Sequence, residues 1–177
     1  MPMRTAANGR RYRSHVFAGT DPETLNRSLD VRTRLSAEGG AWIFSATLSP
    51  RDVGHAFPTG DVFRRLELTA WVEGDESSLQ TLIYTRSFQD HARSQGATAA
   101  IIVREEASDT RVQANREEGS ERELRFANPR GAALRFRLDY LRMPREQARA
   151  QNVPDSANRT MLREGTLTAH GASARAE

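Results

Sequence analysis

Residues 63–72 read Phe-Arg-Arg-Leu-Glu-Leu-Thr-Ala-Trp-Val, and this stretch decides the fold class. The apolar residues at positions 66, 68, 70 and 72 alternate with the polar residues at positions 65, 67 and 69. A period of two residues is typical of a β-strand that buries one of its faces. We therefore expect a strand over 63–72 with its even-numbered residues in a core and with Arg65, Glu67 and Thr69 directed to solvent.

Similar stretches occur along most of the chain, and they predict further strands over 41–48, 79–84, 99–103, 124–126, 134–140 and 161–167. In 41–48, Trp42, Phe44, Ala46 and Leu48 share one face. In 134–140, Leu134, Phe136, Leu138 and Tyr140 would point inward, and Arg135, Arg137 and Asp139 outward. Short strands separated by polar turns indicate a mainly β fold, an antiparallel β-sandwich.

Two short helices are expected beside the strands. Thr20 or Asp21 can cap a helix that starts at Pro22, because Ser, Thr and Asp side chains accept hydrogen bonds from free backbone amides and proline suits the first turn. Leu25 and Leu29 would then share one face of this helix. A second short helix is expected over 144–151.

The chain of 177 residues suits a single domain, and we find no internal repeat. We expect an extended N-terminal arm over 1–20, the β-sandwich domain over 21–169 and a disordered tail over 170–177.

The segment just before the strand over 63–72 contains a distinct motif. Residues 54–60 read Gly-His-Ala-Phe-Pro-Thr-Gly. Pro58 fixes φ for a tight turn, and Gly60 can adopt the positive φ that such turns often need. We expect a rigid loop that holds His55 and Phe57 at a fixed place beside a sheet.

This loop resembles the Gly-His-x-x-Pro-Thr-Gly element in the non-haem, β-rich part of multihaem c-type cytochromes. Upstream, residues 15–19 read His-Val-Phe-Ala-Gly and resemble a His-x-Phe-x-Gly element that connects the last haem-binding segment of that family to its β-domain. The resemblance covers residues 11–150. It departs from the family in one respect: the chain has no cysteine, so no Cys-x-x-Cys-His site can attach a haem here.

The resemblance implies contacts with the haem of a partner, for which His55 and His15 are the candidates, because a histidine from elsewhere often fills the sixth position of a c-type haem. It also implies an interface, with contributions from Phe57, Pro58, Gly60, Arg64, Arg65, Arg11 and Arg13. Arginine forms bidentate pairs with carboxylates such as haem propionates. Plainer interpretations stay open: His55 bonding to the neighbouring backbone, and a solvated strand face for Arg64 and Arg65.

The function that follows is that of a non-catalytic accessory subunit or domain in an electron-transfer complex. It would dock on or stabilise a multihaem c-type cytochrome of a respiratory or photosynthetic membrane complex, in the periplasm or another extracytoplasmic compartment, with no haem of its own. The chain would be a separate subunit, a cytochrome relative that lost its haems, or one piece of a longer protein. The alternative is a free-standing β-sandwich that binds a protein, a peptide or a glycan.

Other classes find little support. All 26 basic residues are arginine, and they are interleaved with 23 acidic residues for a net charge of +3, so nucleic-acid binding is not expected. The sequence shows no signal peptide and no apolar run long enough for a membrane span. It also lacks a nucleophile elbow, a phosphate-binding loop and a histidine pair at i, i+4 spacing, so we expect neither an enzyme nor a zinc site.

Overall fold

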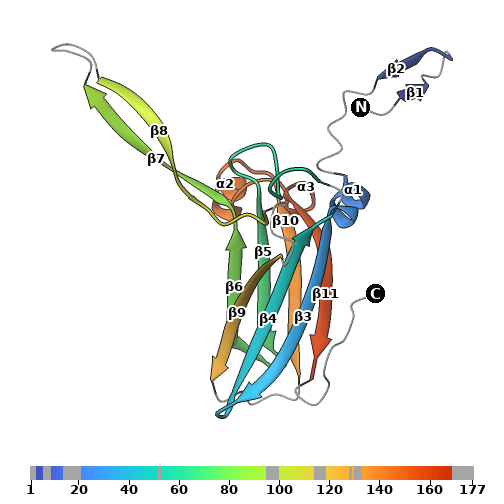
Figure 1. The fold of residues 1–177 in the computed structure, drawn as a ribbon, viewed down its shortest axis with the longest axis vertical. Helices are drawn as coiled ribbons and strands as arrows, with labels where there is room; N and C mark the ends of the chain where they lie inside the picture. Colours follow the sequence, from blue (N-terminus) through green and yellow to red (C-terminus); the bar gives the residue numbers. More distant parts are fainter. Residues whose placement is uncertain are drawn as a thin grey trace.

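The computed structural model describes residues 3–5, 9–13, 21–51, 53–94, 100–113, 119–127, 129 and 133–168, and its centre is an antiparallel β-sandwich (Figure 1). One sheet has the strand order β11-β10-β5-β6, formed by Arg159–Leu167, Leu134–Leu141, Arg65–Val72 and Asp75–Tyr84. The second sheet has the order β3-β4-β9, formed by Leu29–Glu38, Ala41–Pro50 and Ser120–Ala127. The predicted fold class is confirmed.

Three short helices lie at one end of the sandwich: α1 (Pro22–Arg27), α2 (Arg145–Ala150) and α3 (Asp155–Asn158) (Figure 1). A long hairpin of β7 (Arg86–Ser94) and β8 (Ala100–Asp109) leaves the body from the same end. A small hairpin pairs β1 (Met3–Thr5) with β2 (Arg11–Arg13). No helix in the described part of the chain is long and apolar enough to cross a membrane.

The core lies between the two sheets and is built from the side chains that the alternation predicted. Leu66, Leu68, Ala70 and Val72 of β5 are all buried. The two sheets meet directly where the rings of Phe44 and Phe136 lie 5.6 Å apart between centroids. Apolar burial of this kind is the main favourable term in folding.

The segment after α1 differs from the prediction. Asp21 caps α1 through a hydrogen bond from Thr24 N, as expected, but the helix ends at Arg27 and Leu29 is already the first residue of β3. The Ser28 hydroxyl donates to Thr24 O and closes the last turn. Leu25 and Leu29 are both buried, yet they do not share a helix face, and the strand over 29–38 was not predicted.

The β7–β8 hairpin was predicted only in part, through the apolar residues 99–103. Its strands are held together by polar side chains as well as by the backbone: Arg104 donates two hydrogen bonds to the Asp90 carboxylate, at 2.8 and 3.0 Å, and the Ser87 and Ser108 hydroxyls lie 2.7 Å apart. A hairpin outside the core needs no buried face, so it leaves no apolar alternation in the sequence.

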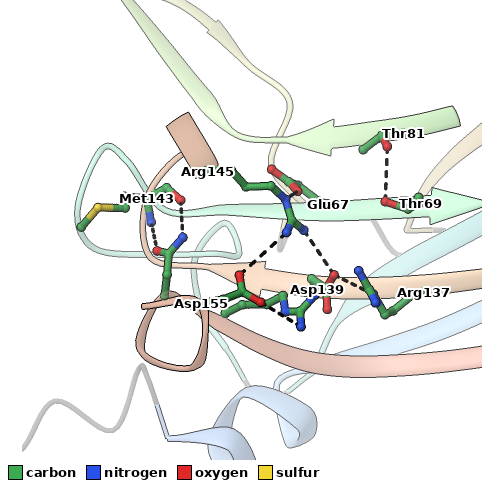
Figure 2. Close-up of polar contacts among 10 residues, drawn as sticks. Glu67, Thr69, Thr81, Arg137, Asp139, Met143, Arg145 and Asp155 are labelled. Carbon is green, nitrogen blue, oxygen red and sulfur yellow. Dashed lines mark hydrogen bonds and ion pairs between the residues drawn. The ribbon is translucent and has the colours of Figure 1, made fainter. Parts of the chain in front are cut away.

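Glu67 and Asp139 do not point to solvent, which corrects the prediction for both. Only 7% of Glu67 and 0% of Asp139 is exposed, although both lie on the outer face of their sheet. They are direct cross-strand partners in β5 and β10. The α2–α3 segment covers this part of the face, so the carboxylates are withdrawn from water (Figure 2).

Two arginines compensate these carboxylates, as Figure 2 shows. Arg145 of α2 donates from Nε to Glu67 Oε2 at 2.8 Å and from Nη2 to Asp139 Oδ2 at 3.5 Å. Arg137, also expected to be a plain surface residue, donates from Nε to Asp139 Oδ2 at 2.9 Å. Buried carboxylates need such partners, because the cost of removing a lone charge from water is large.

A buried asparagine fixes the path of the chain between the helices. Asn158 accepts a hydrogen bond from Met143 N at 3.0 Å and donates one to Met143 O at 3.1 Å. Asp155 forms ion pairs with Arg159 at 2.9 Å and with Arg145 at 3.9 Å. The helical segment is thus tied to the end of β10 and to the start of β11.

The core makes a direct prediction for two leucines. Leu68→Ala should lower the free energy of unfolding by about 2 to 5 kcal/mol, because it leaves a cavity between the sheets. The matched control Leu79→Ala, at a residue 55% exposed on β6, should change it by no more than about 0.5 kcal/mol. Denaturant unfolding followed by circular dichroism measures both, and similar losses would contradict the assigned core.

The arginine contacts make a second prediction. Arg145→Met should destabilise the protein by about 3 kcal/mol, since it leaves two buried carboxylates opposite each other without their shared cation. Arg149→Met, on the exposed side of the same helix, should have little effect. Adding Glu67→Gln and Asp139→Asn to Arg145→Met should restore part of the loss in denaturant unfolding. A deficit unchanged by these two neutralising substitutions would show that the cost of Arg145→Met is not electrostatic.

Candidate functional site

The loop 53–64 connects β4 to β5 at the end of the sandwich that carries the helices. Its middle is anchored in the core by an antiparallel bridge: Phe57 N donates to Val112 O at 2.8 Å, and Val112 N donates to Phe57 O at 2.9 Å. Both side chains are buried, and the Phe57–Pro58 peptide is cis. Phe57 therefore holds the loop beside the sheet, where the sequence placed it.

Gly60 adopts φ +100°, in agreement with the positive φ that the turn was expected to need. The guanidinium of Arg64 folds back over it, and Nη1 donates to Thr59 O at 3.0 Å. A Cβ at position 60 would lie 2.6 Å from this nitrogen. Asp61 closes the turn: its carbonyl accepts from Arg64 N at 3.1 Å, and its Oδ1 accepts from Phe63 N at 3.2 Å. Both the backbone conformation and the Arg64 position thus require glycine here.

A cavity of about 700 Å³ lies between this loop, α1 and the end of β10. Its lining consists of Thr24, Leu25, Ser28, Val53, His55, Phe57, Pro58, Thr59, Gly60, Asp61, Arg64 and Tyr140. His55 is exposed at this cavity and makes no hydrogen bond to another described residue. The described part of the chain therefore does not show the backbone contact that was one interpretation of His55.

Tyr140 is the most buried polar residue of the lining. Only 1% of the residue is exposed, and its hydroxyl has no hydrogen-bond partner among the described residues. Burial raises the pKa of Tyr140, and the nearby charges of Arg64 and Arg142 oppose this effect. Arg64 and Asp61 of the loop line the same cavity as Tyr140.

A second buried tyrosine lies two strands away in the same row of the inner face, because Leu66 is the cross-strand partner of both Tyr140 and Tyr84. Burial raises the pKa of Tyr84 to about 12, opposed by the charge of Arg122. The guanidinium of Arg122 lies 5.1 Å from the ring centroid of Tyr84. Tyr84 does not line the cavity.

The structure brings five of the predicted site residues together around the cavity: His55, Phe57, Pro58, Gly60 and Arg64. Phe57 and Pro58 are buried, so they support the loop and offer little surface to a partner. Of the remaining candidates, Arg65 and Arg11 lie away from the cavity lining. Arg65 begins β5 and its buried Nε has no hydrogen-bond partner among the described residues; Arg11 is exposed in β2. The side chain of Arg13 and all of His15 lie outside the described residues.

Sequence reasoning missed Tyr140 and Leu25 as cavity residues. The alternation correctly placed Tyr140 on an inward face, but nothing local indicates that this face ends beneath a loop far away in the sequence. Within the described ranges, no group of three His, Asp or Glu residues is arranged to hold a metal ion. The arrangement is that of a binding cavity with apolar walls and a few polar groups.

No family model and no curated protein matches this chain. Among solved structures, the fold is similar to that of a penta-heme cytochrome c552 from Thermochromatium tepidum, with a TM-score of 0.62 and 19% sequence identity. The match covers 85% of this chain and 42% of that chain, so this chain spans less than half the length of the cytochrome. The resemblance predicted from the loop is supported at the level of the fold.

The turn under Arg64 makes a testable prediction. Gly60→Ala should destabilise the protein by about 1 kcal/mol or more, because alanine is strained at this positive φ and its Cβ would displace Arg64. Gly54→Ala is the matched control in the same loop, since a Cβ there would meet nothing within 4 Å. Thermal unfolding of the two variants compares them, and equal stability would contradict the described turn.

Proposed function

We propose that this chain is a non-catalytic module of an electron-transfer complex that contains a multihaem cytochrome, on which it docks or which it stabilises. The observation that carries the proposal is the likeness of 85% of this chain to part of a penta-heme cytochrome. A fold alone does not define a function, so the loop and its surface provide the further support.

The haems in this proposal belong to another polypeptide or to another segment, because these 177 residues contain no cysteine for thioether attachment. The sandwich would contribute a surface on which the cytochrome docks. The complex would lie in the periplasm or another extracytoplasmic compartment, with this module peripheral to the membrane.

The proposed docking surface, which we term the loop face, consists of His55, Gly60, Asp61, Phe63 and Arg64. Phe63 is 42% exposed although it is a large aromatic residue, and His55 is exposed in the same loop. Aromatic and arginine side chains are enriched at protein interfaces. The adjacent β7–β8 hairpin leaves the same end of the sandwich and would extend the contact (Figure 1).

His55 has two possible tasks in this interface. As an exposed histidine with no hydrogen bond to another described residue, it is available either to ligate a haem iron of the cytochrome or to bond a polar group of its surface. Both tasks are proposals, and they differ in what they do to the haem spectrum.

The experiment is co-purification of the tagged protein from membranes of its native cells, followed by haem staining. A haem protein should co-purify with the wild type. Phe63→Ser should reduce its yield by about fivefold or more, as expected for a central aromatic contact worth at least about 1 kcal/mol. Leu79→Ser, which removes a similarly exposed apolar side chain from the sheet face, should leave the yield unchanged.

Failure to recover any haem protein with the wild type would overturn the proposal and favour the free-standing binding module. In the recovered complex, His55→Ala separates the two tasks. If His55 ligates iron, the visible spectrum and the potential of one haem will change, and if it bonds to a polar group the spectrum will stay the same.

A further inference from the structure

The cavity behind the loop face has the size of a small-molecule site. Its volume of about 700 Å³ falls inside the range of about 300 to 1,000 Å³ that is usual for ligand pockets. Leu25 of α1 forms part of its wall together with Val53, Phe57 and Pro58 of the loop. Such a wall suits an apolar body.

One polar group in this cavity is unsatisfied. Tyr140 is 1% exposed, and its hydroxyl finds no hydrogen-bond partner among the described residues. Buried polar groups are nearly always paired, and an unpaired one is destabilising. The hydroxyl itself has almost no accessible surface, so it can donate to an acceptor such as a carboxylate oxygen only when a ligand displaces the atoms that cover it.

A cation belongs to the same lining. Arg64 lines the cavity together with Tyr140, and its charge lowers the pKa of Tyr140. The Arg64 guanidinium has five N–H donors, and its hydrogen bond to Thr59 O is the one that it makes to the described residues. Donors therefore remain for a ligand.

The charges around the cavity favour an anion. Asp61 is the carboxylate of the lining, and it is exposed with Oδ1 already accepting from Phe63 N. It is opposed by the positive charges of Arg64 in the lining and of Arg142, which also lowers the pKa of Tyr140.

We propose that this cavity binds a small organic acid with an apolar body and one carboxylate. The carboxylate accepts hydrogen bonds from the Tyr140 hydroxyl and the Arg64 guanidinium, and the body packs against Leu25, Val53 and Phe57. The site shares His55, Gly60, Asp61 and Arg64 with the loop face, but it needs no residue of a partner, so it can be tested on the isolated protein.

The test is calorimetric titration of the isolated protein with phenylbutyrate, octanoate and indole acetate, each beside its primary amide. At least one acid should bind saturably, and its amide should bind about tenfold more weakly. N-acetylglutamate amide, a carboxylate without a large apolar body, serves as the model of a partner's acidic side chain. It should bind much more weakly than the best acid.

Matched variants locate the site. Tyr140→Phe and Arg64→Gln should each weaken binding of the acid by about tenfold. Tyr84→Phe is the control, because Tyr84 is also buried with an unpaired hydroxyl but does not line the cavity. Tyr140→Phe keeps the ring and removes an unpaired hydroxyl, so it should fold at least as well as the wild type, which thermal unfolding verifies. The ring signals of His55 in NMR spectra should shift with the acid, and those of exposed His91 on the hairpin should not.

Three results would overturn the proposal: no saturable binding by any acid of the panel, equal binding of acid and amide, or unchanged affinity in both Tyr140→Phe and Arg64→Gln. Binding of N-acetylglutamate amide as tight as that of the best acid would also overturn it, because the site would then recognise a bare carboxylate of a partner. None of these results affects the docking proposal, which co-purification tests separately.

Discussion

The ion pairs that Arg145 makes to Glu67 and Asp139 are the contact on which the functional end of this sandwich depends. Two carboxylates directly opposite each other on neighbouring strands repel, and their burial adds to the cost. Arg145 offsets both effects, and because it belongs to α2, these ion pairs hold the helix against the sheet. Side chains alternate across a strand, so the same register that directs Asp139 toward α2 directs Tyr140 into the cavity. Asp139, with its ion pairs on the outer face, and Tyr140, in the cavity lining on the inner face, are thus neighbouring residues at one strand end.

The sequence predicted the parts of the fold that local rules control. The alternation in β5 and β10 assigned both core faces correctly, and Asp21 and Pro22 marked the start of α1. The polar residues Glu67 and Asp139 were assigned to solvent, because periodicity distinguishes the two faces of a strand but does not show whether a distant helix covers the outer one. Leu25 and Leu29 fit a helical spacing, yet the chain turns at Ser28, where packing of Leu29 in the sheet prevails over the local pattern.

In the candidate site, too, the sequence predicted the features that depend on local residues and missed those that depend on distant ones. Pro58 and Gly60 restrict the backbone of the loop, and the positive φ of Gly60 agrees with the turn expected from residues 54–60, whereas the cis Phe57–Pro58 peptide was not predicted. The position of the loop depends on the bridge between Phe57 and Val112, and the cavity depends on Leu25 and Tyr140. These contacts join segments far apart in the chain, so no spacing rule reveals them. The sequence therefore indicated where the site begins but not what surrounds it.

The two buried tyrosines of the inner face differ in what surrounds them. Tyr84 and Tyr140 flank Leu66 on the inner face, and neither hydroxyl has a hydrogen-bond partner among the described residues. Tyr84 gains a compensating contact, because the guanidinium of Arg122 lies over its ring and also donates to Ile83 O, which joins β9 to β6. That tyrosine strengthens the connection between the sheets. Tyr140 instead lines a cavity together with Arg64, so its covered and unpaired hydroxyl lowers the stability of the unliganded protein, and in the proposed complex a ligand pairs it. The apolar core, from Phe44 to Leu68, supplies stability that does not depend on this end, and the cost of such a group can therefore persist there.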